Sequence, residues 1–371
     1  MNILHFYKTS IYESFGGVEK FIDELTLNTK NYGVNNTIIA LTPKNINSFK
    51  EYNGVKVYFC KTNIDYASTP MSISAFKIFK EVIKDIDLIH YHFPYPFSDI
   101  INLVSANNKK YIITYHSDIV KQKKLLLIYK PLMKNFLDGA EKIVATSQNY
   151  LESSSVLRKY RSKVDIIPCG LTNDLIYFNK DKASEKIIKR KYGEKYFFFV
   201  GRLVYYKGID FLIDAAKLNN YSLVIAGKGN YFKDINKEIK KHNLKHVHLI
   251  GEISKNEKYN LMSNCYSFIF PSNQRSEAFG LSLLEASMFS KPLISCEIGT
   301  GTTFINKNNE TGLVIKPNDS TAINSSMKYL WDNESISKKF GENSYKRYEE
   351  LFTAKKMSES YIRLYKSIIN I

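Results

Sequence analysis

The sequence contains few cysteines and no long apolar segment. Its four cysteines are scattered without the spacing of a metal or redox motif, so we expect reduced, mostly buried thiols. No apolar run approaches the ~20 residues that cross a bilayer. The first residues pass directly into a predicted strand without a basic leader. These features predict a cytoplasmic protein that is neither exported nor integral to a membrane.

Acidic residues are in the minority. There are 36 Asp and Glu against 53 Lys and Arg, which gives a formal net charge of +17. This excess predicts an anionic partner, and the candidates are nucleic acid, substrate phosphates and an anionic membrane surface. Nucleic acid is the weaker candidate because the sequence contains no RNA-binding motif or basic recognition helix of the usual kinds.

One basic segment, residues 121–137, combines lysines with Leu, Ile, Met and Phe at helical spacing. Pro131 is expected to kink or restart this helix. Two interpretations remain open. The segment is either an amphipathic helix that attaches peripherally to the inner face of an anionic membrane, or a surface helix with solvated lysines and its apolar side on the core.

The chain is too long for one ordinary core, so two domains are expected. Strand patterns at residues 3–7 and 36–41 flank a loop at 16–20 and a helix at 21–28, and this βαβ alternation predicts an α/β fold with parallel sheets. We place an N-terminal domain at 1–171, a C-terminal domain at 172–351 and a final amphipathic helix within 352–371. The polar stretch 173–195 is the expected linker.

Two glutamates, Glu277 and Glu285, flank a strand-to-helix junction. Residues 266–271 are typical of a strand, and helical spacing follows from Gly280. A helix that begins there directs the amides of residues 279–281 and the positive end of its dipole outward, which favours a bound phosphate. Glu285 then lies roughly 7 Å further along the helix. The alternative is that both glutamates are ordinary charges of a helix start and a solvated helix face.

A second motif follows the apolar strand at 196–200. The strand ends at Gly201 and Arg202, and Lys207 comes five residues after the arginine. A guanidinium and an ammonium at this spacing can hold a diphosphate between them. They would stabilise the negative charge that develops on a departing nucleoside diphosphate.

These motifs resemble those of the retaining glycosyltransferases of family four, over nearly the whole chain. The resemblance implies the GT-B fold, in which two Rossmann-like domains face a central cleft and the final helix crosses back to the first domain. It implies that Arg202 and Lys207 bind the diphosphate, Glu277 the sugar and Glu285 the ribose. It implies no metal and no cofactor beyond the nucleotide sugar. The donor-binding residues that it implies are Gly16, Gly17, Arg202, Lys207, Gly251, Ile253, Glu277, Ala278, Phe279, Gly280, Leu281 and Glu285.

In the N-terminal domain the strand at 111–115 delivers His116 and Asp118 to its carboxyl end. The resembled family has a histidine at this place near the donor sugar, so His116 is the predicted catalytic-site residue here, unless it is a core histidine bonded to a carbonyl. Asp118 is expected to orient His116 or meet the acceptor, and His92 is a second acceptor-side candidate. His90 and His92 share one face of a strand, but no third metal ligand is expected in register.

Some positions depart from the family pattern. Cys169 and Thr172 replace its usual residues after the Ile-Pro pair, and Gly-Thr-Gly-Thr-Thr at 299–303 replaces its usual Gly-Gly-x-Pro-Glu. The second departure resembles bacterial surface-polysaccharide, O-antigen-type mannosyl- and rhamnosyltransferases.

We therefore expect an enzyme that transfers a hexosyl group with retention from a nucleotide sugar, with a GDP-mannose-type donor favoured, to a saccharide or lipid-linked saccharide. The alternatives are a UDP- or dTDP-sugar donor, a GT-B sugar-nucleotide epimerase and, more remotely, a nucleic-acid-binding protein.

Overall fold

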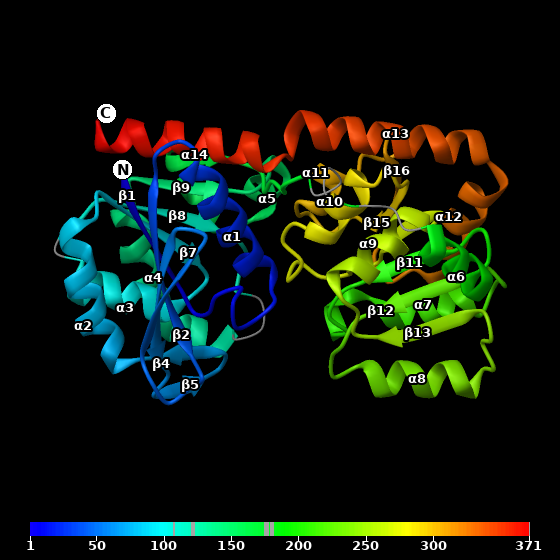
Figure 1. Ribbon diagram of the computed structural model, residues 1–371, viewed down its shortest axis with the longest axis horizontal. Helices are drawn as coiled ribbons and strands as arrows, with labels where there is room; N and C mark the ends of the chain where they lie inside the picture. Colours follow the sequence, from blue (N-terminus) through cyan, green and yellow to red (C-terminus); the bar gives the residue numbers. More distant parts are fainter. Residues whose placement is uncertain (107, 120–122, 174–177, 179–181, 371) are drawn as a thin grey trace. The chain divides into compact units, whose positions relative to one another are not determined.

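The computed structural model describes residues 1–106, 108–119, 123–173, 178 and 182–370. The chain forms two compact units, one of Met1–Thr172 with Thr353–Ile371 and one of Asn173–Phe352 (Figure 1). Each limit lies one residue after the limit expected from the sequence. Residues 121 and 122 of the basic segment, and all of 174–181 except Phe178, lie outside the described residues.

The first unit contains an eight-stranded sheet and a separate two-stranded one. The strands are β1 (Asn2–Tyr7), β2 (Asn35–Thr42), β3 (Ser48–Tyr52), β4 (Val55–Lys61), β5 (Ile64–Tyr66), β6 (Thr69–Met71), β7 (Leu88–Phe93), β8 (Tyr111–Tyr115), β9 (Lys142–Ala145) and β10 (Val164–Ile166). The large sheet has the order β10-β9-β8-β7-β1-β2-β4-β3, and β3 alone is antiparallel to its neighbour. The chain changes direction across the sheet between β1 and β7, which is where open α/β sheets bind ligands.

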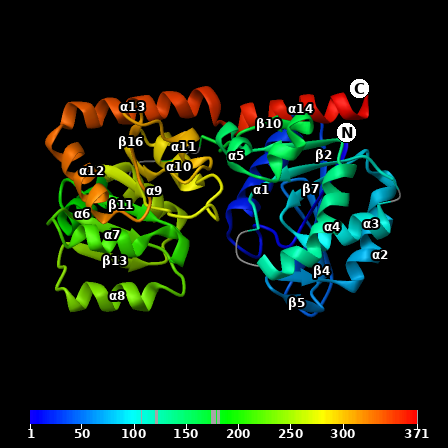
Figure 2. The ribbon, with the colours of Figure 1, turned by 180° about the vertical axis from the view of Figure 1, so that it is seen from behind.

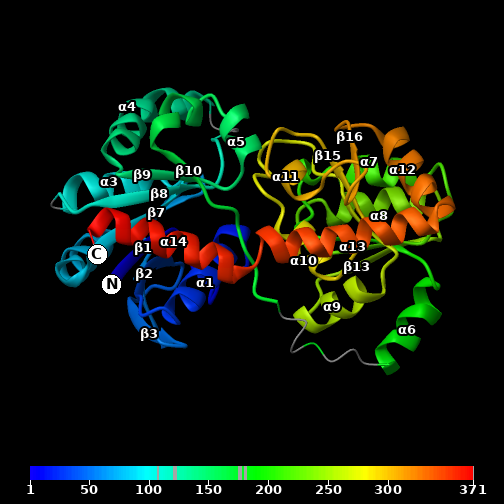
Figure 3. The ribbon, with the colours of Figure 1, turned by 90° about the horizontal axis from the view of Figure 1, so that it is seen from above.

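Helices cover both faces of this sheet. They are α1 (Gly17–Lys30), α2 (Ile73–Val82), η1 (Ile83–Asp85), α3 (Pro96–Ser105), α4 (Lys123–Gly139), α5 (Gln148–Ser153), η2 (Leu157–Lys163) and α14 (Ala354–Ile369). Side chains alternate between the faces of a strand. Phe6 of β1 therefore packs against Phe79 of α2, whereas His90 of β7 bonds Tyr365 of α14 on the opposite face. Figure 2 shows α2, α3 and α4 on one side, and Figure 3 shows α14 running over the other.

The second unit is a six-stranded, fully parallel sheet between helices. Its strands are β11 (Phe197–Val200), β12 (Leu223–Ala226), β13 (Val247–Gly251), β14 (Ser267–Phe270), β15 (Leu293–Cys296) and β16 (Gly312–Ile315). Its helices are α6 (Lys182–Tyr192), η4 (Tyr205–Lys207), α7 (Ile209–Ala216), α8 (Phe232–Lys241), α9 (Lys255–Asn264), α10 (Leu281–Met288), α11 (Thr302–Ile305), α12 (Ser320–Asp332) and α13 (Glu334–Leu351). The order β13-β12-β11-β14-β15-β16 is that of a Rossmann sheet, with its switch point between β11 and β14.

The structure corrects three local predictions. Helix α1 begins at Gly17, so Glu19 and Lys20 form its first turn and are not part of the loop. The expected linker contains the eleven-residue helix α6. Of the two outcomes expected at Pro131, a kink or a restart, the restart does not occur, since α4 continues through this residue. All four cysteines are free and buried, as predicted.

Candidate functional site

The charged residues of the second unit gather at the switch point of its sheet. Arg202 and Lys207 follow β11, and Glu277 follows β14, the neighbouring strand in space. Parallel strands direct their carboxyl ends to one edge, so the two loops meet there. The pattern of apolar strands followed by short polar loops thus brings together residues 70 positions apart, as in the contact of Lys207 with Glu277.

Glycines allow these loops to approach closely. Gly208 has φ of +65°, and a Cβ atom there would lie 2.1 Å from the carbonyl oxygen of Pro271. Gly227, after β12, has φ of +136°, and its Cβ would lie 1.9 Å from the carbonyl oxygen of Gly201. No side chain larger than hydrogen fits these positions without moving backbone. Gly208 therefore allows the loop that carries Lys207 to lie against the end of β14, and Gly227 allows the loop after β12 to lie against Gly201.

Lys207 and Glu277 form a mostly buried ion pair. The Nζ atom of Lys207 bonds Oε2 of Glu277, and the exposed fractions of the two side chains are 11% and 13%. The ammonium also lies 4.7 Å from the centre of the Phe270 ring. Ser272 donates a longer hydrogen bond of 3.4 Å to the same carboxylate oxygen. A charge pair with this little solvent is strongly coupled, so a ligand that binds one partner changes the environment of the other.

Helix α10 begins beside this pair. Gly280 is its N-cap, with φ of +97°, and has no side chain with which to cap the first amides. Phe279, just before it, is buried against Phe352. The first turn of the helix therefore carries unpaired backbone donors and the positive end of its dipole, three residues from Glu277. This is the arrangement expected of an anion site at residues 279–281.

Glu285, one turn into α10, is also paired with a lysine. Lys258 of α9 bonds Oε1 of Glu285 at 2.5 Å, and both side chains are mostly buried. Ser254 and Glu257 form a capping box that starts α9 and so fixes the position of Lys258. The site therefore contains two carboxylates, and each is neutralised by one lysine.

Gly251 and Ile253 lie at the carboxyl end of β13, beyond β12. Gly251 has φ of +76°, and its carbonyl oxygen accepts a 2.7 Å hydrogen bond from the amide of Gly227. Arg202 is exposed, and its guanidinium donates to the hydroxyl of Tyr206 at 3.3 Å. Of the residues implied in this unit, Lys207, Glu277 and the start of α10 are thus in one cluster, with Arg202 on the same loop as Lys207.

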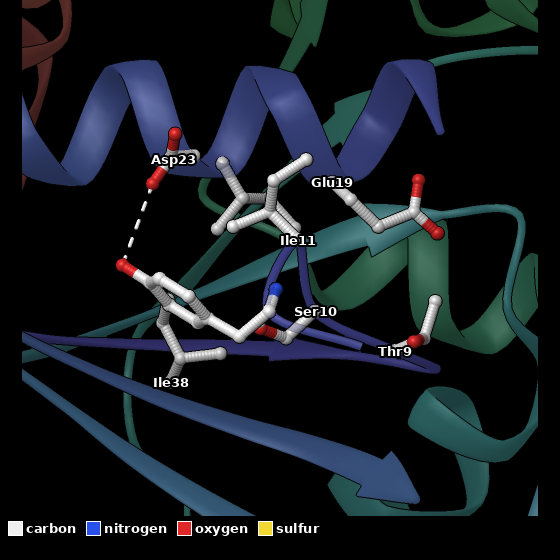
Figure 4. A pocket seen from close by; sticks show the side chains of 8 residues that line it. Thr9, Ser10, Ile11, Glu19, Asp23 and Ile38 are labelled. Atoms are coloured by element: carbon white, nitrogen blue, oxygen red, sulfur yellow. Dashed lines mark hydrogen bonds between the residues drawn. The ribbon is translucent and has the colours of Figure 1, made fainter. Parts of the chain in front are cut away.

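In the first unit, Gly16 is the N-cap of α1, and Gly17 is its first residue. A pocket of about 10 Å³ lies between this helix and the loop after β1 (Figure 4). It is lined by Thr9, Ser10, Ile11, Tyr12, Glu19, Ile22, Asp23 and Ile38. The hydroxyl of Tyr12 donates to Asp23 across it. A space of this volume holds about one water molecule, so it is a packing gap and not a substrate site.

His116 and Asp118 follow β8 but have different partners. His116 is 7% exposed, packs against the edge of Phe21 and bonds His92 at 3.1 Å. Asp118 accepts hydrogen bonds from Tyr115 and Ser154 at 2.9 and 2.7 Å. Burial lowers the pKa of His116 from 6.5 to about 3, so its imidazole is neutral at ordinary pH.

His92 is 0% exposed, so an acceptor cannot touch it directly, contrary to the role expected from the sequence. The expectation that no third imidazole is in register with His90 and His92 is also wrong. His5 pairs with His90 across β1 and β7, and ligand atoms of the three rings lie within 4.8 Å of one another. Their ring nitrogens are bonded to one another and to Asn36, Thr114, His116 and Tyr365. A metal ion would have to displace these hydrogen bonds.

Comparison with known proteins settles the family. The family model "Glycosyltransferase Family 4" matches residues 15–174, and "Glycosyl transferases group 1" matches residues 180–347. The chain is 40% identical to O-antigen chain mannosyltransferase C of Escherichia coli over 369 residues, which cover 100% of this chain and 99% of the relative. The chain is a family-four glycosyltransferase.

Other glycosyltransferases agree with this assignment. D-rhamnosyltransferase WbpZ of Pseudomonas aeruginosa is 39% identical, over 95% of this chain and 93% of the relative. Sucrose-phosphate synthase from Thermosynechococcus elongatus has a similar fold, with a TM-score of 0.82 at 21% identity, covering 100% of this chain and 99% of that one. The fold is GT-B, with two Rossmann-like domains and parallel sheets.

Two paired residues, one in each unit, were not identified from the sequence. Lys258 is one of the two lysines of α9, and only its contact with Glu285 of α10 distinguishes it. His5 lies in a short apolar strand, and nothing local links it to a histidine 87 positions away. Among the described helices, none is long and apolar enough to span a bilayer.

Proposed function

We propose that this glycosyltransferase moves a hexosyl group, with retention, from a GDP-mannose-type donor to a saccharide or lipid-linked saccharide in the synthesis of a bacterial surface polysaccharide. The similarity to a mannosyltransferase and to a D-rhamnosyltransferase supports this class of sugar. The single observation that carries the proposal is the Lys207–Glu277 pair at the start of α10.

This pair suits a site that exchanges partners when the donor binds. The diphosphate takes the positions in reach of Lys207, Arg202 and the first amides of α10. Glu277, released from Lys207, then accepts hydrogen bonds from hydroxyls of the sugar. Because the ammonium and the amides face the leaving diphosphate, they stabilise charge that grows in the transition state. Glu285, held by Lys258, is placed for the hydroxyls of the ribose.

With the donor bound, Glu277 accepts hydrogen bonds from sugar hydroxyls and Glu285 stays paired with Lys258, which argues against either as a covalent nucleophile. We therefore propose front-face attack, with the leaving phosphate oxygen as the base that takes the acceptor proton. Charge stabilisation by Lys207 and Arg202 takes the place of a metal ion, so the reaction needs none. Transfer that continues at full rate in excess chelator is the expected result.

A nucleotide screen tests the donor. A ligand at about 100 times its dissociation constant adds about 2.7 kcal/mol to the stability of the folded protein, so GDP should raise the unfolding temperature more than UDP or dTDP. The anomeric signal in the proton NMR spectrum of the product should match the α-configuration of GDP-mannose. An inverted product contradicts retention. Turnover of donor without any acceptor favours an epimerase, and steeply salt-dependent binding to random oligonucleotides favours a nucleic-acid binder.

We further propose that α4 attaches this cytoplasmic enzyme to an anionic membrane surface. Leu127 and Ile128 are 66% and 81% exposed, and Lys130 and Lys134 on the same helix are exposed as well. Apolar side chains inserted among lipid headgroups, with lysines beside anionic lipid, are typical of an interfacial helix.

Co-sedimentation with vesicles of phosphatidylglycerol and phosphatidylcholine tests this attachment. Leu127→Glu should release the protein from the vesicles. The matched control is Ile187→Glu on α6, where the replaced side chain is 65% exposed, and it should bind as the unaltered protein does. Equal vesicle binding by both variants, or no binding at low salt by the unaltered protein, contradicts the proposal.

A further inference from the structure

A row of hydrogen-bonded side chains crosses the first sheet from β2 to β8. Asn36 of β2 bonds His5 of β1 at 3.2 Å, His5 bonds His92 of β7 at 3.1 Å, and His92 bonds His116, the residue after β8, at 3.1 Å. Each step passes to the neighbouring strand, because the sheet order is β2-β1-β7-β8. We refer to Asn36, His5, His92 and His116 as the imidazole row.

The amide of Asn36 has only one possible orientation. Its Nδ2 atom donates to the carbonyl oxygen of Thr26 at 2.9 Å and to Oγ1 of Thr29 at 3.0 Å. The Thr26 carbonyl has no proton to give. The Thr29 hydroxyl donates its own proton to the carbonyl oxygen of Leu25 at 2.7 Å, so it accepts from Asn36. The amide nitrogen must therefore face α1, and Oδ1, an acceptor, must face His5.

This orientation determines the proton position on every ring of the row. His5 must donate through Nε2, and a neutral imidazole has one proton, so its Nδ1 is an acceptor. His92 must then donate to it through Nε2 and accept through Nδ1. His116 donates to His92 through Nε2, which leaves Nδ1 of His116 with a lone pair. The rings are neutral because burial lowers the pKa of His5 to about 4 and that of His116 to about 3, and places that of His92 well below 6.5.

We propose that Asn36, His5 and His92 are positioning residues that hold His116 as its Nε2–H tautomer, so that His116 meets a sugar hydroxyl as a hydrogen-bond acceptor through Nδ1. This role for His116 rests on the proposed sugar transfer, whereas the tautomer itself does not. Several polar side-chain atoms of the described residues are fully buried and have no hydrogen-bond partner. Nδ1 of His116 does not belong to this group, which agrees with its access to a ligand. A hydroxyl can donate to it, but a phosphate oxygen at that place is repelled.

His90 provides a matched control within the same cluster. It is fully buried next to His5 and His92, but its nitrogens bond Tyr365 at 2.8 Å and Thr114 at 2.6 Å, so it is outside the row. The competing use of these rings is a metal site of His5, His90 and His92. Bound zinc needs an unprotonated nitrogen from each ring. The facing nitrogens of His5 and His92 share one hydrogen bond, so one of them carries a proton.

The test is long-range proton–nitrogen NMR on protein labelled with ¹⁵N in its histidine rings, with the ligand-free full chain. We expect protonated Nε2 and unprotonated Nδ1 on His5, His92 and His116. Asn36→Leu removes the fixed acceptor and should give His116 a mixture of both tautomers. His90→Gln should leave the His116 signals unchanged. A proton on Nδ1 of His116, an unaltered tautomer in Asn36→Leu, or loss of the Nε2 protons on addition of zinc overturns the proposal.

A pair of variants at the centre of the row adds a kinetic readout. His92→Gln keeps one donor and one acceptor, whereas His92→Leu keeps neither. We expect His92→Leu to lower kcat about tenfold, equivalent to about 1.4 kcal/mol, with the dissociation constant for GDP unchanged, and His92→Gln to recover most of the loss. Equal loss in both variants overturns the positioning role. If no nucleotide sugar is turned over but the tautomers are as expected, the proposed transfer fails and the row stands.

Discussion

The buried imidazoles should make the first unit sensitive to acid, and His5 allows the size of the effect to be worked out. Burial lowers its pKa from 6.5 in the unfolded chain to about 4 in the folded one, against a smaller upward effect of the bond to Asn36. Between pH 6.5 and about pH 4, His5 binds a proton in the unfolded chain but not in the folded chain. The contribution of neutral His5 is therefore fully present above pH 6.5 and is lost as the pH falls toward 4.

For one such group, the free energy of unfolding falls by about 2 kcal/mol between about pH 7.5 and about pH 5. His5→Gln removes this proton uptake but can still bond Asn36 and His92. We expect the variant to be less stable than the unaltered protein near neutral pH, and the deficit to shrink by about 2 kcal/mol at the lower pH. Comparison of the two proteins cancels the titrating groups that do not interact with His5, whereas His90 and His92, whose pKa values His5 helps to lower, contribute to the difference.

Asp99 provides a control of opposite sign. Burial raises its pKa from 3.8 to about 8, despite hydrogen bonds from Tyr129 and Ser98 that lower it. In this pH range Asp99 is protonated in the folded chain and ionised in the unfolded chain. Its contribution to the free energy of unfolding therefore grows as the pH falls from 8 toward 3.8. Asp99→Asn should therefore lose about 3 kcal/mol relative to the unaltered protein over the same interval.

Urea unfolding followed by hydrogen exchange in peptides of β1 and β7 measures the stability of the first unit. Trp331, the single tryptophan, lies in the second unit, and its fluorescence follows that unit separately. A difference between His5→Gln and the unaltered protein that stays constant with pH, while Asp99→Asn changes as expected, would refute the assignment of a depressed pKa to His5.

Three further predictions concern the second unit. Glu277→Gln removes the charge paired with Lys207, so transfer should fall about 100-fold in a radiolabelled-sugar assay while GDP still binds; undiminished transfer contradicts its role. Lys258→Met leaves Glu285 without its cation, and GDP affinity by calorimetry should weaken by about tenfold; unchanged affinity removes Glu285 from the ribose site. Gly208→Ala places a Cβ atom against the Pro271 carbonyl at a positive φ, so the second unit should lose about 2–4 kcal/mol of stability. Urea unfolding followed by Trp331 fluorescence measures this loss, and an unshifted unfolding transition contradicts the close approach.

The alternation of strands and helices was predictable because it depends on local periodicity. The apolar strand before Gly201 and the helical spacing after Gly280 are confirmed as β11 and α10. The antiparallel strand β3 and the β5–β6 pair were not predicted. Their exposed or half-buried residues give weak periodicity, so no apolar face distinguishes them from loops.

The site was predictable in its residue types but not in its pairings. Both glutamates and the basic pair stand out by spacing near strand ends, and the comparisons confirm the family that this spacing indicated. Lys207 and Glu277 meet where Gly208 approaches Pro271 closely, and nothing in the local sequence indicates this approach. The imidazole row likewise arises from strand order, since three of its members lie on β2, β1 and β7 and the fourth follows β8, and β1 and β7 are neighbours in the sheet but not in the chain.

The chain leaves the first unit after Thr172 and returns to it only at Thr353. During synthesis the second unit is contiguous and can complete its sheet while it emerges from the ribosome. The first unit can pair its strands, which all precede Thr172, but its sheet stays partly uncovered, because Tyr361 and Tyr365, which bond Thr114 and His90, are translated only after the second unit. In the nascent chain, His90 therefore stays uncovered until α14 has been made, and removing or displacing α14 should impair the folding of the half of the enzyme that is translated first.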